Sequence, residues 1–210
     1  MSIAEKLVTI AENQQKVYDA GRTDTIANNV LGYVDETMTE MTVAEFKNNT
    51  KLKEIQLPLV TSIPSNAFYG CKSLETVNLP SLATAGTSAF NLCAALKSVF
   101  FPSLTTMGTS AFYNCKLLEF ADLGQCTKIG QQGFRNTSLK TLVLRRPTVC
   151  ELPSSASTMW AGSAFAPGGV GGKVYVPSTL IESYKTASNW STMFDAGRCE
   201  FLPIEGSEYE

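Results

Sequence analysis

Histidine is missing from all 210 residues of this chain. Because histidine is the commonest general base and a frequent zinc ligand, its absence argues against Ser-His-Asp catalysis and most zinc sites. No two of the six cysteines have the C-x-x-C spacing of zinc ribbons or thioredoxin-like redox sites. P-loop, G-x-S-x-G and EF-hand motifs are missing too. The sequence therefore predicts a protein that is not an enzyme and that uses no metal or cofactor.

Long apolar runs and an excess of basic residues are also missing. No apolar run reaches the roughly 18 residues that a membrane span needs, so no span is expected. The formal net charge of −2 leaves no basic excess to neutralise phosphates, which disfavours nucleic acid as a partner. Glu5, Lys6 and Glu12 stand where a secretory signal would have its apolar core, so no typical signal peptide is visible.

What the sequence does contain is an internal repeat with a period of 22 residues. Its most regular column is phenylalanine: Phe46, Phe68, Phe90, Phe112 and Phe134. The unit reads L-x-x-V-x-L-P-x-L-x-x-I-G-x-x-A-F-x-x-C-x-x, and its V-x-L alternation predicts a short strand that ends at proline. One such unit cannot bury its own apolar face. The repeat therefore predicts a solenoid of stacked coils, and its period and L-x-x-V-x-L core lie in the leucine-rich range.

The A-F-x-x-C segment and the strand that ends in L-P resemble the BspA-like leucine-rich repeats of bacterial surface proteins. The resemblance covers about residues 41–204. It implies a curved leucine-rich-repeat solenoid with a parallel β-sheet and an irregular or 3₁₀ convex side. Such a solenoid is non-enzymatic and acts as a protein-interaction scaffold. It further implies that the chain binds another protein or a surface glycan, in cell adhesion or host interaction. The implied location is the bacterial cell surface or the extracellular space.

The repeats divide the chain into five predicted segments. These are an N-terminal amphipathic helix (1–21), a linker and N-terminal capping region (22–45), the leucine-rich repeats (46–153), an irregular loop insertion (154–172) and a C-terminal cap (173–210). S-A-F returns at 163–165, after a longer gap than the repeat allows. In the cap we expect a strand, a helix and a last short strand. A capping box at Thr179 and Glu182 predicts the start of that helix, and Trp190 is expected to cover the open end of the core.

The predicted N-terminal helix carries an apolar seam with one polar layer: Ile3, Leu7, Ile10, Gln14 and Val17. Its two heptads leave two interpretations open. The helix either packs on the solenoid or associates with copies of itself, which would make a homo-oligomer. This segment also resembles leaders of proteins encoded in prophage tail regions. That resemblance implies an alternative function as a phage tail component, located in a virion.

Three cysteines share one position of the repeat: Cys71, Cys93 and Cys115. Asn49 precedes and Thr137 follows them in this column, so a small, weakly hydrogen-bonding residue fits there. We expect a buried structural ladder, since free buried cysteine behaves as a small apolar residue. A disulfide between neighbouring coils is the alternative that geometry permits. Metal binding is disfavoured because a linear column of thiols is not a tetrahedron.

The outward side chains of the predicted strands give the candidate binding surface. One column alternates in charge: Lys53, Glu75, Lys97, Glu119 and Lys140. Apolar residues occupy other outward positions, which predicts an exposed patch for a partner, burial beneath a loop or subunit, or exposure that is simply tolerated. Trp160, in the irregular loop, is either a binding anchor or a plug for the gap. The candidate partner-binding residues are Phe100, Phe120, Asp122, Val143, Arg145, Arg146 and Trp160.

Overall fold

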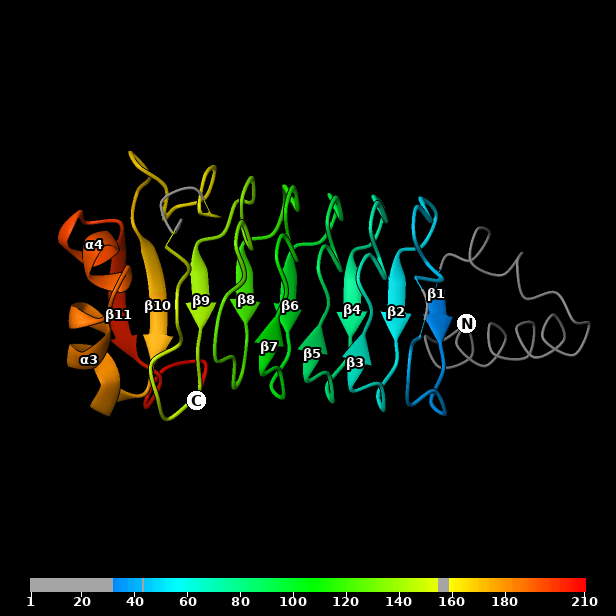
Figure 1. Ribbon diagram of the computed structural model, residues 1–210, viewed down its shortest axis with the longest axis horizontal. Helices are drawn as coiled ribbons and strands as arrows, with labels where there is room; N and C mark the ends of the chain where they lie inside the picture. The colour runs from blue at the N-terminus through cyan, green and yellow to red at the C-terminus, as the bar shows by residue number, and fades with distance from the viewer. Residues whose placement is uncertain (1–31, 43, 155–158) are drawn as a thin grey trace, which may run out of the picture.

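The computed structural model describes residues 32–42, 44–154 and 159–210. In this part of the chain, short parallel strands lie side by side along the long axis of the molecule (Figure 1). They form two hydrogen-bonded sheets, ordered β1-β2-β4 and β6-β8-β9-β10-β11. The strands are β1 (Gly32–Val34), β2 (Glu54–Gln56), β4 (Thr76–Asn78), β6 (Ser98–Phe100), β8 (Phe120–Asp122), β9 (Thr141–Val143), β10 (Gly172–Val176) and β11 (Cys199–Pro203).

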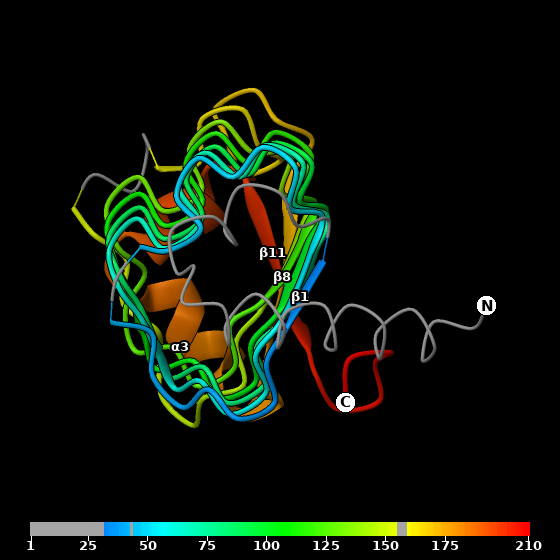
Figure 2. The same cartoon turned by 90° about the vertical axis from the view of Figure 1, so that its right-hand side faces the viewer.

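A second parallel ladder runs along another side of the coils. It consists of β3 (Ser62–Ile63), β5 (Thr84–Ala85) and β7 (Thr106–Met107), paired in that order. Viewed along the axis, the successive coils superpose into one tube (Figure 2). The predicted solenoid with parallel strands is therefore confirmed. Its expected 3₁₀ side is instead built from turns and this ladder, and the 3₁₀ turn of the described residues, η1 (Ser178–Leu180), lies in the cap.

The core is organised by a column of stacked aromatic rings. The five repeat phenylalanines are buried, and their ring centroids lie 5.2 to 5.4 Å apart with planes within 17° of parallel. Trp160 continues the column, because its ring lies 5.5 Å from Phe134 at an angle of 4°. Tyr33 closes the other end with an edge contact to Phe46. The ring spacing is close to the distance of about 4.8 Å between neighbouring strands, so one ring fits each coil.

The three cysteines of the repeat donate hydrogen bonds from coil to coil. The Sγ atoms of Cys71, Cys93 and Cys115 lie 2.9, 3.2 and 3.0 Å from the carbonyl oxygens of the preceding coils. Those carbonyls belong to the phenylalanines of the ring column: Phe46, Phe68 and Phe90. All six cysteines are buried free thiols, and burial raises the pKa of Cys71 to about 12. These contacts support the structural role that we expected of the column.

The C-terminal cap covers the end of the core with α3 (Ile181–Thr186) and α4 (Trp190–Asp195), which pack beside β11 (Figure 2). Two aromatic residues fix the backbone of Cys150: Trp190 Nε1 donates to its carbonyl at 2.6 Å, and Tyr184 Oη accepts from its amide at 2.9 Å. Trp190 is fully buried, as expected. The predicted capping box is wrong, because η1 precedes α3 and no side chain caps either element.

The predicted N-terminal helix lies outside the described residues. The same holds for its seam residues Ile3, Leu7, Ile10, Gln14 and Val17, so both interpretations of the seam stay predictions. Within the described ranges, none of the helices has the length and apolarity that crossing a membrane would need.

Candidate interaction surface

Two rows of side chains face outward from strands β6 to β10. The register places Phe100, Asp122, Val143 and Tyr175 in one row across the four strands. Phe120 belongs to the other row, beside Thr141. The residues between the rows, such as Val99 and Leu142, point into the core because side chains alternate along a strand. We call Phe100, Phe120, Asp122, Val143 and Tyr175 the sheet-face site.

The sheet-face site is only partly open to solvent. Phe100 is 54% exposed, which agrees with the predicted patch. Phe120 is half-buried. Val143 is fully buried, so the prediction that it is exposed is wrong. The open part of the site is therefore its β6 end.

Residues 204–210 lie against the less exposed part of the site. This tail segment follows β11 and returns along the outer side of the strands towards β9 (Figures 1 and 2). The Tyr209 ring lies 5.3 Å from the Phe120 ring on β8 and 4.7 Å from the Tyr175 ring on β10. Val143 lies on β9, the strand between those that carry Phe120 and Tyr175. Burial under a loop was the alternative left open for the apolar outward positions.

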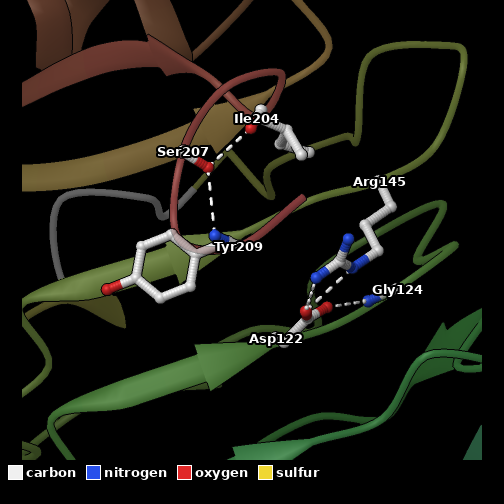
Figure 3. A network of polar contacts seen from close by, with 6 residues as sticks. All are labelled: Asp122, Gly124, Arg145, Ile204, Ser207 and Tyr209. Carbon is white, nitrogen blue, oxygen red and sulfur yellow. Dashed lines mark hydrogen bonds and ion pairs between the residues drawn. The ribbon is translucent and has the colours of Figure 1, made fainter.

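Asp122 is the buried charge of the surface and is neutralised by the next coil. Its Oδ2 accepts bonds from Arg145 Nε at 2.9 Å and Nη2 at 2.7 Å, and its Oδ1 accepts from the Gly124 amide at 3.0 Å (Figure 3). The Asp122 side chain is 1% exposed, against 25% for Arg145. Asp122 therefore holds the coils together and is not available for direct contact with a partner, contrary to its place among the binding candidates.

Gly124 shows a signal that sequence reasoning missed. It stands where three earlier repeats have proline: Pro58, Pro80 and Pro102. Its φ of +51° is a left-handed conformation, and a Cβ atom there would lie 2.2 Å from the Pro102 carbonyl oxygen. Unlike proline, Gly124 also has an amide hydrogen to donate to Asp122. The change from L-P to L-G, one residue after an outward aspartate, could have indicated this contact.

We expect Asp122→Ala to lower the free energy of unfolding by about 2–3 kcal/mol. The reason is that the Arg145 guanidinium and the Gly124 amide both lose their acceptor. Water reaches part of Arg145, which keeps the loss below that of a fully buried pair. Asp122→Asn is the matched control, because its oxygen can still accept from Gly124, so a smaller loss is expected. Urea unfolding measures both, and an unchanged midpoint for Asp122→Ala would contradict the prediction.

The two remaining partner-binding candidates, Trp160 and Arg146, do not belong to the sheet-face site. Trp160 is buried in the ring column, so it is a plug and not a binding anchor. Arg146 is half-buried, and its Nε donates to Thr148 Oγ1. One rung of the predicted charge column is an ion pair, with Lys140 Nζ 2.9 Å from Glu119 Oε1. In the described ranges, no group of three or more metal-ligating residues comes together.

The stacked parallel coils and their buried aromatic column define a leucine-rich-repeat solenoid. Residues 35–156 match the family model of the BspA type leucine rich repeat region in six copies. Since this match spans more than half of the 210 residues, the chain belongs to the BspA-type leucine-rich repeat family.

A solved structure of a leucine-rich repeat protein from Bacteroides ovatus is similar to this chain, with a TM-score of 0.53 and 21% sequence identity. The likeness covers 72% of this chain and 44% of that one, so the matched part is less than half of that protein. At this identity it shows the fold alone. No curated protein matches the chain.

Proposed function

We propose that this chain is a non-enzymatic scaffold that binds another protein through the sheet-face site, in cell-surface adhesion or host interaction. The observation that carries the proposal is Phe100, a large aromatic side chain that is 54% exposed on β6, the edge strand of its hydrogen-bonded sheet. Aromatic residues are enriched among the few residues that supply most of the energy of protein interfaces. Phe120 and Tyr175 extend the aromatic surface from Phe100 towards β10.

The backbone beneath this site supports a role in binding. Strands β6, β8, β9 and β10 are hydrogen-bonded in that order, and the Asp122–Arg145 pair ties two coils together within the site. Such a preformed surface loses little conformational entropy when a partner binds, so more of the contact energy appears as affinity. Catalysis has no comparable support, and the family membership favours a scaffold.

The test compares Phe100→Ser with Leu117→Ser. Leu117 lies in a turn and is 50% exposed, so it loses a similarly exposed apolar side chain away from the strands. Immobilised extracellular-matrix proteins and surface glycans serve as probes for the full chain by biolayer interferometry. We expect a matrix protein to be bound, with at least a tenfold loss for Phe100→Ser and little change for Leu117→Ser. Equal binding by both variants would show that another surface is used, and binding to glycans alone would contradict a protein partner.

The alternative function is a phage or prophage tail component that is assembled through residues 1–21. It is supported by the seam of Ile3, Leu7, Ile10, Gln14 and Val17 and by the resemblance of that segment to prophage tail-region leaders. In that case the solenoid would carry the receptor-recognition surface, and the helix would attach it to the particle. Both functions use the sheet-face site in the same way, and they differ in what the N-terminal segment contacts.

A further inference from the structure

We infer that the β8–β10 part of the sheet-face site receives an aromatic side chain from an acidic segment of a partner protein, and that Tyr209 occupies this place until the partner displaces it. The inference rests on the proposed function and names the chemistry of the partner. Its evidence is an occupant that is already present: an aromatic ring of the tail segment lies on Phe120 and Tyr175.

The place fits a planar ring. Tyr209 meets Phe120 at an interplanar angle of 31° and Tyr175 at 70°, so one neighbour is tilted and the other is edge-on. These are the arrangements that aromatic pairs prefer. Val143, on the intervening strand, is fully buried. An aromatic side chain from another protein would find the same two rings.

The tail segment is built so that the ring can leave without unfolding the cap. The hydrogen bonds of its backbone and of Ser207 run within the segment or to the cap: Ser207 Oγ donates to Ile204 at 2.6 Å, and the Tyr209 amide donates to Ser207 Oγ at 3.1 Å (Figure 3). Glu205 accepts from the Ser178 amide at 2.9 Å. The Tyr209 side chain reaches the repeat strands, through its ring contacts and through a hydrogen bond between its hydroxyl and Thr141. Its contact is therefore separable from the bonds that anchor the segment.

The charges beside the ring indicate an acidic partner segment. Glu208 and Glu210 flank Tyr209 in the sequence, so the present occupant is an aromatic residue between two carboxylates. On the strands, Lys173 is exposed in the row that contains Thr141, with the exposed Glu200 of β11 opposite it, and the Arg145 guanidinium is already paired with Asp122. The acidic character of the partner segment is therefore inferred from the carboxylates that flank the present occupant.

Phe100 gives a partner an advantage over the tail segment. It lies three strands from Tyr175 in the same row, a distance of about 14 Å at the usual strand spacing. The ring of Tyr209 covers the β8–β10 part and leaves Phe100 exposed. A partner segment that spans roughly four to five extended residues could fill both places, and the added contact would favour displacement of Tyr209.

The test uses the full chain with Tyr209→Ala, which vacates the place while the rest of the tail segment stays. The probe is a synthetic peptide with the sequence of residues 204–210, IEGSEYE. Amide chemical shifts of Phe120, Thr141 and Tyr175 are followed by NMR during titration to millimolar peptide. We expect saturable shifts in Tyr209→Ala and at least about tenfold weaker binding to the unmodified chain, because the tethered ring competes at a high effective concentration.

Three controls test whether binding of the probe needs its tyrosine, its glutamates or Phe100. A peptide with alanine in place of tyrosine should leave those amides unchanged, and one with lysine in place of all three glutamates should bind several-fold more weakly. Phe100→Ser combined with Tyr209→Ala should bind the probe as well as Tyr209→Ala does, because the tail segment does not cover Phe100. The inference is overturned if the probe causes no shifts in Tyr209→Ala, or if the alanine or lysine peptide binds equally well. Either result leaves the proposed function to be judged by the Phe100 comparison.

Discussion

Phe90→Ala is expected to lower the free energy of unfolding by about 3–5 kcal/mol, the upper range for a buried phenylalanine. The Phe90 ring is fully buried between those of Phe68 and Phe112, at 5.2 and 5.3 Å, and also lies 5.8 Å from Phe101. Its removal leaves a cavity and breaks the column into two shorter stacks. In a solenoid, where each coil contacts only its neighbours, this weakens two coil interfaces at once.

The cavity cannot close by collapse of the coils. The Phe68 amide donates to Ala89 at 2.7 Å and the Phe90 amide donates to Ala111 at 2.9 Å, so backbone bonds on both sides fix the coil spacing. The cost of a large-to-small substitution is highest where the surroundings cannot relax. Phe100→Ala removes the same group from an exposed position and should cost less than about 1 kcal/mol. Urea unfolding of both variants gives the comparison, and equal losses would refute the role of the ring column.

The repeats could be predicted from the sequence because each coil places the same side chain in the same environment. The phenylalanine column, the cysteine column and the strand alternation all report one period, and the structure stacks them at one spacing. The period does not predict the position of Trp160 in the ring column. S-A-F at 163–165 has the wording of the repeat, yet Phe165 packs at a tilt against Trp160, and Trp160 itself stacks on Phe134. The column continues with an aromatic ring after Phe134, but Trp160 lies in the irregular loop, where the 22-residue period no longer holds. The period therefore could not identify Trp160 as the next ring.

The sheet-face site could be predicted only in part because its exposure depends on contacts without a period. Phe100 has no cover and matches its outward position. Val143 is also outward but fully buried, and Tyr209, which lies on the rings of the two flanking strands, is far away in the sequence. Asp122 likewise looks like a solvated strand residue until Arg145 of the next coil is placed beside it. Contacts between distant segments override the exposure that alternation assigns.

Gly108→Ala is the second substitution for which a large effect is expected, a loss of about 3 kcal/mol or more in the free energy of unfolding. A Cβ atom at Gly108 would lie 2.6 Å from the Thr87 amide nitrogen and 2.7 Å from the Gly86 carbonyl carbon. Both atoms are backbone of the preceding coil, so no side chain can turn away to make room. Gly130 approaches Gly108 in the same manner, with 2.4 Å between its added Cβ and the Gly108 oxygen.

The coils would have to separate at this corner to admit the methyl group. Their separation is held by bonds on either side of it, from the Gly108 amide to Ala85 at 2.9 Å and from the Ser110 amide to Gln131 at 2.7 Å. Gly197→Ala is the control: its Cβ would meet nothing within 4 Å, and its φ of +65° should cost only about 1–2 kcal/mol. Chemical unfolding therefore separates a steric cost from a conformational one. If Gly197→Ala proved the more damaging substitution, backbone contact between coils would not be what requires glycine at position 108.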